Sequence, residues 1–284
     1  MNRRDFSKAI LAAPALSACS SMPSSGAIDS HCHIWDKGSS LNGYKNYEFS
    51  QLNKIASQKG ISRFIVVVLY SDINESYVLK LKRQFSDKIS IISLLDPADK
   101  HLEKKMKLNK EKGILGYRLN SKFVGESWLK QPGVDKMWKI AAELDISMCL
   151  LRKTNASFKS MSEMMKKHQN TKVVIDHLGL VNPESTQEVS EFLALSKYEK
   201  CHVKVSRFFT DRAKQYGSEK ILPFINKLNQ SFGSNRLMWG SNAPVEVSQH
   251  KDYHSAVDLI RNASFLSETD KENIFQNTAE KLFF

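Results

Sequence analysis

The stretch Val173-Val174-Ile175-Asp176-His177-Leu178-Gly179 is a short apolar, β-branched run that stops at two polar residues. Such a run is typical of a strand that is buried on both faces of a parallel sheet. Similar runs recur along the chain, and longer amphipathic segments separate them. We therefore predict eight strands, at Ala27–Ile34, Arg63–Leu69, Ile89–Leu95, Leu115–Asn120, Ile146–Leu151, Lys172–His177, Cys201–Ser206 and Arg236–Gly240.

The segments between these strands carry the apolar spacing and the end signals of helices. The predicted helices are Asn74–Phe85, Asp99–Lys112, Gly133–Leu144, Phe158–His168, Glu184–Tyr198, Glu219–Phe232 and His250–Ala263. A last helical stretch, 267–284, begins with the cap pair Ser267 and Asp270. Eight strand and helix pairs in this length predict an α/β fold, a single-domain (β/α)₈ TIM barrel over residues 27–284. An open doubly wound sheet, the alternative, uses fewer strands and a phosphate-binding turn that the sequence lacks.

The first residues have the anatomy of an export signal. Residues 1–18 combine a basic start with a short apolar stretch and predict a cleavable signal peptide. The segment Arg3-Arg4-Asp5-Phe6-Ser7-Lys8 resembles the twin-arginine motif, and Leu16-Ser17-Ala18-Cys19 resembles a lipobox with Cys19 as the lipidated residue. We therefore expect an exported protein, either periplasmic or anchored as a lipoprotein on the extracytoplasmic side, with residues 19–26 as a linker.

Composition excludes several partner classes. The formal net charge is +12, but Lys and Arg are spread along the chain among acids, which is typical of solvated helix faces. Zinc-finger spacing, a glycine-rich phosphate loop and an RNA-binding signature are absent from the sequence, so we expect no nucleic-acid partner. A membrane would be reached only through the lipid on Cys19. The other cysteines, Cys32, Cys149 and Cys201, lie in apolar runs without CxxC spacing, which predicts buried thiols.

Polar residues gather where the predicted strands end, and in such barrels these ends carry the chemistry. At the first strand, alternation places His31 and His33 on one face and Cys32 on the other. Two imidazoles at that spacing can share a divalent metal ion, although isolated pairs of this kind also occur as ordinary core or surface residues. His177 arrives at the end of the sixth strand, and Asn242 follows the eighth.

Three motifs stand in order: Asp-x-His-x-His at 29–33, Asp-His-Leu-Gly at 176–179 and Gly-Ser-Asn-Ala-Pro at 240–244. Together they resemble the amidohydrolase superfamily, in the branch of 2-pyrone-4,6-dicarboxylate lactonase and related sugar-lactone hydrolases, and the resemblance covers residues 27–284. It implies a barrel that hydrolyses lactones or related carboxylic esters with water as the nucleophile. Some members use one zinc ion and others use no metal.

The resemblance also implies roles for individual residues. His31, His33 and His177 would bind a metal ion, zinc in the first place, or in a metal-free site donate hydrogen bonds to the substrate carbonyl. Arg118 matches an arginine that holds a substrate carboxylate or hydroxyl through its planar fork, with a salt bridge at the barrel mouth as the alternative. Arg207 ends the seventh strand and is a further candidate for substrate binding.

Two aromatic residues adjoin these motifs. Trp35 and Trp239 are candidates for the wall of a substrate pocket, with ordinary core packing as the alternative. The predicted partner is a small carboxylate-bearing lactone or ester, and no oligomeric state is predicted.

Asn242 departs from the family pattern, which has an aspartate there. That carboxylate moves a proton between water and the leaving oxygen, work that contributes roughly 10² to 10⁴ in rate, and an amide cannot do it. Glu246 or Asp211 would have to replace it, or a zinc-bound water would lessen the need for a base. Three hypotheses stay open: a lactone or ester hydrolase impaired at Asn242, a non-oxidative decarboxylase, and a catalytically disabled barrel that acts as a surface-anchored binding protein.

Overall fold

The computed structural model describes residues 26–36, 40–41, 44–45, 47–69, 74–121, 125–152, 158–207, 216–247 and 250–284. The predicted signal peptide and Cys19 lie outside them. Eight parallel strands form one sheet that follows chain order apart from a short antiparallel hairpin, β2 and β3. The strands are β1 Ala27–Cys32, β2 Ser40–Leu41, β3 Tyr44–Lys45, β4 Ile61–Val67, β5 Ile89–Ser93, β6 Ile114–Asn120, β7 Ser147–Leu151, β8 Val173–Ile175, β9 Cys201–Val205 and β10 Leu237–Trp239. All eight predicted strands are confirmed, with ends that differ by a few residues.

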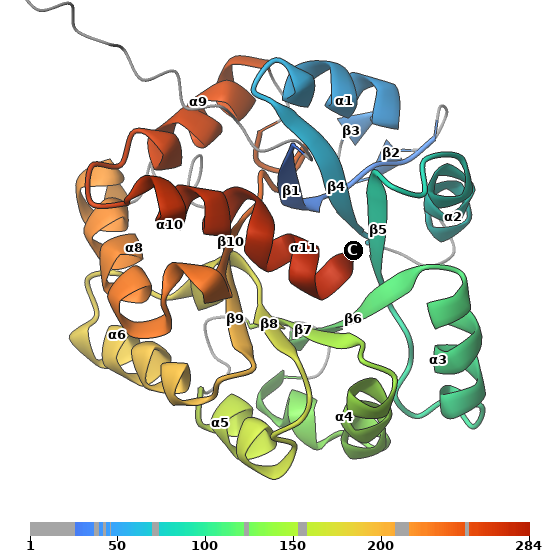
Figure 1. The fold of residues 1–284 in the computed structure, drawn as a ribbon. Coiled ribbons are helices and arrows are strands. Elements are labelled where there is room, and N and C mark those ends of the chain that lie inside the picture. The colour runs from blue at the N-terminus through green and yellow to red at the C-terminus, as the bar shows by residue number, and fades with distance from the viewer. Residues whose placement is uncertain are drawn as a thin grey trace, which may run out of the picture.

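The first and last strands of the sheet meet just beyond their carboxyl ends. The backbone N–H of Asn242 donates to the carbonyl of His31 at 2.7 Å, and that of His33 donates to the carbonyl of Ala243 at 2.8 Å. Gly240 permits this approach, because a Cβ there would lie 2.7 Å from Cβ of His31 and 2.8 Å from its backbone nitrogen. The result is a nearly closed eight-stranded parallel barrel, as in a TIM barrel (Figure 1).

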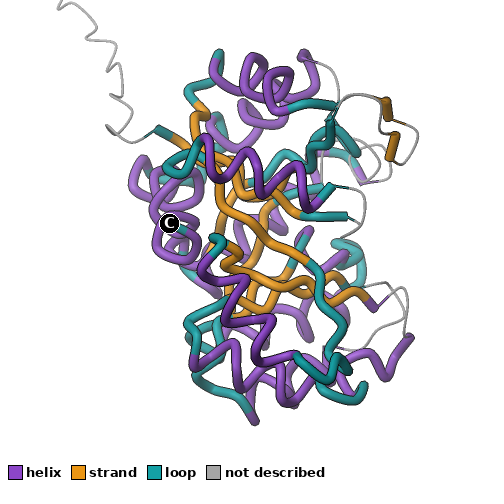
Figure 2. Tube along the Cα trace, turned by 90° about the vertical axis from the view of Figure 1, so that its right-hand side faces the viewer, coloured by secondary structure: helices purple, strands orange, loops and turns teal. Residues whose placement is uncertain are grey.

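Helices surround the strands, as the sequence predicts (Figures 1 and 2). They are α1 Phe49–Ser57, α2 Glu75–Gln84, α3 Leu102–Glu111, α4 Val134–Glu143, α5 Phe158–Lys167, α6 Thr186–Leu193, α8 Ser218–Phe232, α9 His250–Arg261, α10 Glu268–Glu272 and α11 Thr278–Phe283. Helix α1 was not predicted, although the residues that it buries, Phe49, Leu52 and Ala56, have helical spacing. The predicted cap is confirmed, since the Ser267 side chain accepts from the Asp270 N–H at the start of α10.

Two hydrophobic layers hold the barrel. The larger layer includes the strand residues that face outward, such as Val66 and Val203, and the apolar faces of the helices that cover them. The smaller layer fills the barrel itself, where buried inward side chains from six strands meet α11. Its buried residues are Ile28, Ile65, Val67, Ile92, Cys149, Val174, Met238, Ala279, Leu282 and Phe283. The helix α11 therefore closes the amino-terminal end of the barrel (Figure 1), and the catalytic candidates lie toward the other end.

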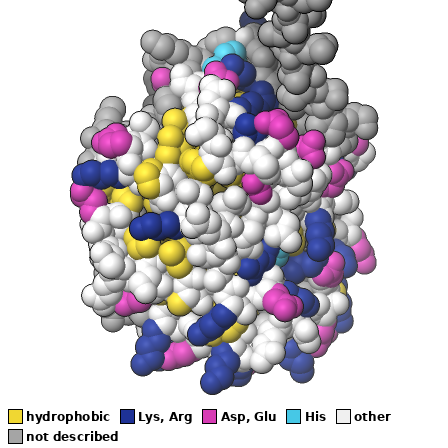
Figure 3. All heavy atoms as spheres, turned by 60° about the vertical axis from the view of Figure 1, so that its left-hand side comes forward, with side chains coloured by type: hydrophobic (Ala, Val, Ile, Leu, Met, Phe, Trp, Pro, Cys, Tyr) yellow, Lys and Arg dark blue, Asp and Glu magenta, His cyan; other side chains and the backbone are white. Residues whose placement is uncertain are grey.

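Surface and cysteine features agree with the composition. On the face drawn in Figure 3, Lys and Arg side chains are interspersed with Asp and Glu. Within the described ranges, no helix combines the length and the apolar character needed to cross a bilayer. Cys32, Cys149 and Cys201 are buried and unpaired with one another, which confirms the prediction of buried thiols for these three residues.

Candidate active site

An irregularity in β1 directs its two histidines into the barrel. Ile28 belongs to the inner layer, but the register of β1 against β4 shifts between Asp29 and Cys32, and Cys32 packs in the outer layer. Such a bulge changes the phase of the alternation, so His31 and His33 share the inward face. Their ring centroids lie 5.0 Å apart. The predicted shared face of the two histidines is therefore confirmed.

Asp29 is the anchor of this bulge. Its buried carboxyl accepts hydrogen bonds from the backbone N–H of His31 at 3.2 Å and of Ser241 at 2.9 Å. The hydroxyls of Ser241 and Tyr253 donate to the other oxygen at 2.6 and 3.0 Å. Burial raises the pKa of Asp29 to about 6, although these hydrogen bonds act in the opposite direction. One carboxyl thus ties β1 to the loop after β10 and to α9.

Three candidate residues have left-handed backbones just beyond consecutive strands. The φ angles are 58° at His177, 52° at Arg207 and 57° at Asn242. A non-glycine residue in this region costs of order 1 to 3 kcal/mol, and such residues cluster at functional sites. In each case the chain turns sharply at the carboxyl end of its strand, after β8, β9 and β10 respectively. The turns place the side chains of His177 and Asn242 beside the histidines of β1.

His177 is fixed by a hydroxyl on one side and a guanidinium on the other. Its ring centroid lies 4.3 Å from that of His31. Its Nδ1 lies 2.8 Å from Oγ of Ser206, and its Nε2 lies 3.4 Å from Nη2 of Arg118. Because a guanidinium only donates, Nε2 is the acceptor and the proton of this imidazole is on Nδ1. Burial and the neighbouring His31 hold the pKa of His177 well below its usual value, so the ring is neutral.

His33, like His177, carries its proton on Nδ1. Its Nδ1 lies 2.7 Å from the carbonyl oxygen of Val67, which can only accept. Burial lowers the pKa of His33 to about 4, which leaves a lone pair on Nε2 at neutral pH. Nε2 lies 3.3 Å from the Oδ1 position of Asn242. The oxygen and nitrogen of an amide side chain are interchangeable by a half turn about its last bond. With the NH₂ group of Asn242 toward His33, the amide donates a hydrogen bond to Nε2, and its oxygen points away from the ring.

Lys204 is a charged residue inside the barrel that the sequence analysis missed. It is fully buried on β9, between Val203 and Val205 of the outer layer. Its Nζ lies 3.3 Å from Nδ1 of His31 and 3.4 Å from Oδ1 of Asp176. Val203 and Val205 pack in the outer layer, so alternation directs the Lys204 side chain into the barrel.

Arg118 and Asp176 form the salt bridge that was the alternative role for Arg118. The Nε of Arg118 donates to Oδ2 of Asp176 at 2.8 Å, and both side chains are buried. Burial alone would raise the pKa of Asp176, but the charges of Lys204 and Arg118 lower it below its ordinary value. Asp176 is therefore ionised between two cations.

The cluster as a whole is positive. Burial is the largest cause of the lowered pKa of His31, and the charges of Lys204, Arg118 and Arg207 follow. Arg207 is partly exposed, and its charge also acts on His177. With neutral imidazoles, Arg118 and Lys204 both contact the Asp176 carboxylate, and Arg207 adds a third positive charge that acts on His31 and His177. This arrangement favours an anionic ligand.

The histidines as placed do not fit a bound zinc ion. A zinc site needs converging lone pairs, but Nδ1 of His31 faces the Lys204 ammonium and Nε2 of His177 accepts from Arg118. Two fixed cations so close would also repel a divalent one. In the part of the chain that the structure describes, no group of three His, Cys, Asp or Glu residues is arranged to hold a metal ion. The predicted metal ligation is therefore not supported by this arrangement.

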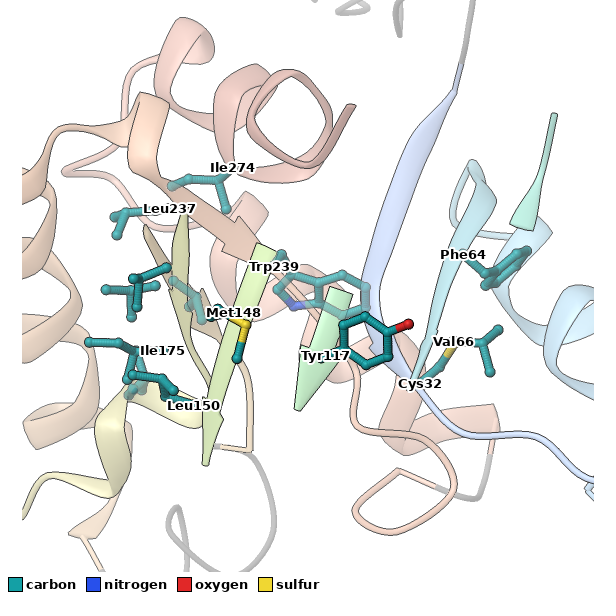
Figure 4. Packing of buried hydrophobic residues seen from close by; sticks show 14 of the residues in the cluster. Cys32, Phe64, Val66, Tyr117, Met148, Leu150, Ile175, Leu237, Trp239 and Ile274 are labelled. Carbon is teal, nitrogen blue, oxygen red and sulfur yellow. The ribbon is translucent and has the colours of Figure 1, made fainter. Parts of the chain in front are cut away.

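The two tryptophans predicted to line the pocket pack in the core instead, which corrects that assignment. Trp239 and Trp35 are both fully buried in the outer layer. Trp239 neighbours the inward Met238 on β10, so it points outward, and its ring lies 5.8 Å from that of Tyr253. Figure 4 shows it among the hydrophobic side chains of this layer. The ring of Trp35 lies 6.0 Å from that of Tyr47.

Of the two acids considered as substitutes for a base at Asn242, Asp211 lies outside the described residues. Glu246 is buried, and its backbone N–H donates to the carbonyl of Asn242 at 3.1 Å. This contact places its backbone next to the site.

Comparisons with known proteins agree with this architecture. A sequence model of the amidohydrolase family matches residues 28–284. The chain is 22% identical over 238 residues to an L-fucono-1,5-lactonase of Burkholderia ambifaria, an alignment that covers 77% of this chain and 80% of that protein.

Two solved structures share the fold. An amidohydrolase from Burkholderia multivorans, crystallised with bound zinc, has a TM-score of 0.78 at 16% identity and covers 90% of this chain and 98% of its own. A protein from Pseudomonas putida to which 2-pyrone-4,6-dicarboxylic acid hydrolysis is ascribed has a TM-score of 0.76 at 21% identity, with coverage of 91% and 97%.

Proposed function

We propose that this chain, which belongs to the amidohydrolase family, hydrolyses the ring ester of a small lactone or a related carboxylic ester. The substrate molecule also carries a carboxylate. One observation carries the proposal: neutral His31, His33 and His177 meet Arg118 and Lys204 at the carboxyl end of one barrel. The similarity to a lactonase and to a protein with an ascribed pyrone hydrolase activity supports the same reaction class.

The positive cluster supplies the binding energy for the substrate carboxylate. Arg207 is partly exposed at the end of β9 and can offer its guanidinium fork without losing a described ion pair. Arg118 holds Asp176 through Nε, and its terminal nitrogens can turn to a ligand carboxylate, Nη2 by leaving its 3.4 Å contact with His177. The carboxylate thereby brings the neighbouring ester carbonyl onto the three imidazoles.

Hydrolysis then needs a polarised carbonyl and a proton acceptor. Hydrogen-bond donors in the cluster stabilise the negative charge that develops on the carbonyl oxygen. His177 takes the proton of the attacking water on Nε2, with Nδ1 fixed by Ser206, once the Arg118 N–H that now lies 3.4 Å from Nε2 turns to the substrate carboxylate. The water oxygen bonds to the carbonyl carbon, the ring C–O bond breaks, and the same imidazole returns the proton to the leaving oxygen. The amide oxygen of Asn242, turned from His33, orients the water, and no step passes through a metal ion.

The test is acid release by the purified full chain in a weakly buffered panel of sugar lactones and carboxylate-bearing lactones. We expect hydrolysis of at least one member and a loss of about 10²-fold or more in His177→Ala. The matched control is His202→Ala, because His202, on β9, is also buried but bonds the backbone carbonyl of Lys200 at 3.0 Å, away from the cluster.

The same panel distinguishes the other hypotheses. Release of carbon dioxide from a carboxylate substrate without ester cleavage would replace hydrolysis with decarboxylation, for which an anion-binding site is also suited. Silence of the wild type together with activity of Asn242→Asp would instead identify a disabled barrel. Equal activity of His177→Ala and the wild type would contradict the proposed mechanism.

A further inference from the structure

We infer that Lys204 is a positioning residue that sets the tautomer of His31, so that the N–H on Nε2 of His31 becomes a hydrogen-bond donor to the substrate carbonyl. The inference rests on the proposed hydrolysis and deepens it. It assigns a task to a buried cation that the sequence motifs leave without one.

The tautomer follows from what each neighbour is able to do. Nζ of Lys204 lies 3.3 Å from Nδ1 of His31, and an ammonium group only donates. Asp176 competes for the same atom as an acceptor, but its Oδ1 is farther away, at 3.5 Å, and is itself held by Lys204 at 3.4 Å. The Nδ1 atom of His31 therefore accepts, and the single proton of the neutral ring is on Nε2.

His31 then differs from the two other imidazoles of the cluster. His33 and His177 both carry the proton on Nδ1, because Nδ1 faces a backbone carbonyl in His33 and the Ser206 hydroxyl in His177. Nε2 of His31 is buried and has no hydrogen-bond partner among the described residues. It lies in a ring that neighbours both other rings, at 4.3 and 5.0 Å between centroids. A buried donor without a partner is an atom prepared for a ligand acceptor.

Removal of the ammonium would reverse this arrangement. Nδ1 of His31 would then face only the Asp176 carboxylate, and the proton would move to Nδ1 to donate to it. All three imidazoles would then carry their lone pair on Nε2, and a divalent metal ion would have to displace only the Arg118 N–H from His177 and the Asn242 amide from His33. Lys204 therefore decides whether the cluster donates hydrogen bonds or is able to bind a metal.

The first experiment uses the wild-type full chain. Nitrogen-15 NMR of ¹⁵N-histidine-labelled protein, with the His31 signals identified by their loss in His31→Gln, reports which ring nitrogen carries the proton. We expect a protonated Nε2 and an unprotonated Nδ1 at neutral pH. A proton on Nδ1 of His31 would overturn the inference. The measurement needs no substrate. Inactivity toward lactones would therefore contradict the proposed hydrolysis, while the NMR spectrum would still report the tautomer of His31.

The second experiment compares Lys204→Met with Lys172→Met, a lysine on the outside that pairs with Asp145 at 2.8 Å. In Lys204→Met we expect the proton of His31 to move to Nδ1. For a lactone that the wild type hydrolyses, kcat should fall about 10²-fold, the cost of one lost oxyanion donor, and KM should change less, because Arg118 and Arg207 still hold the substrate carboxylate. An unaltered tautomer in Lys204→Met, or equal losses of kcat in both variants, would contradict the inference.

The third experiment measures zinc after equilibrium dialysis against zinc chloride, followed by elemental analysis. Lys204→Met should retain zinc in proportion to the protein, whereas the wild type and Lys172→Met should not. Stoichiometric zinc in all three proteins would refute the claim that Lys204 keeps the cluster free of metal.

Discussion

Nε2 of His33 lies 3.3 Å from the side-chain amide of Asn242, so the first and last strands of the barrel present an uncharged pair to each other. From the resemblance to the amidohydrolase family we predict that a fully active site would carry a carboxylate at position 242. An amide has no charge with which to stabilise an imidazolium, and burial lowers the pKa of His33 to about 4. Asn242 therefore leaves His33 neutral.

Asn242→Asp should raise the pKa of His33. A carboxylate at hydrogen-bond distance favours the charged imidazole and shifts its pKa upward by about 1 to 3 units. A histidine NMR titration of wild type and variant measures the shift. The control is Asn235→Asp, an exposed position before β10. An unchanged titration of His33 in Asn242→Asp would show that the two side chains do not interact in solution.

The barrel was predictable from the sequence because a strand that is buried on both faces is a continuous apolar run. The β-branched runs, and glycines such as Gly60 and Gly113 beyond helix ends, with φ of 66° and 89°, follow from local chemistry. Helix α11 was also predicted, but its place inside the barrel was not. That place depends on Phe283 meeting residues from strands far away in the sequence.

The site was predictable where it depended on strand ends and not where it depended on phase. His31, His33 and His177 meet as expected. The bulge after Asp29 leaves no mark in the sequence, although it determines which way both β1 histidines point. Alternation sets Lys204 apart from Val203 and Val205, but it does not say which face of β9 points into the barrel. Trp239 was misplaced because nearness in sequence to Asn242 says nothing about which face of β10 a side chain occupies.

Asp29→Asn should change the pH dependence of stability. The folded pKa of Asp29 is raised from 3.8 to about 6, so the folded state binds this proton more tightly than the unfolded state. The stability it contributes is therefore full below pH 3.8 and is lost as pH rises through 6, by about 3 kcal/mol in total. Asparagine does not titrate.

Urea unfolding of both proteins between pH 4 and pH 8 measures this effect. The free energy of unfolding of the wild type minus that of Asp29→Asn should decrease as pH rises. The titrations of the buried histidines are common to both proteins and largely cancel. A difference that is constant or increases with pH would contradict the raised pKa.

Gly240→Ala should loosen the barrel where it closes. The new Cβ would lie 2.7 and 2.8 Å from Cβ and N of His31, and the backbone of β1 cannot yield as a flexible side chain would. Overpacking of this kind costs about 1 to 3 kcal/mol. Urea unfolding measures the loss, with the exposed Asn235→Ala as the control. Because the new methyl group displaces His31, the rate of hydrolysis of any identified lactone should fall by more in Gly240→Ala than in the control. A Gly240→Ala variant as stable as the wild type would contradict the tight contact between β1 and the end of β10.

Phe283→Ala should destabilise the protein far more than Phe284→Ala, although the two residues are adjacent. The Phe283 side chain is 1% exposed and fills the amino-terminal end of the barrel, whereas Phe284 is 42% exposed beside the Arg63 guanidinium. Truncation of a buried phenylalanine costs about 3 to 5 kcal/mol, and the exposed one about 1 kcal/mol or less. Guanidinium unfolding compares the midpoints at equal slope. Because α11 enters at the end opposite the histidines, the activity per folded molecule should stay close to wild type in both variants. Equal destabilisation would mean that the Phe283 side chain does not fill the barrel, and therefore that α11 does not close its amino-terminal end.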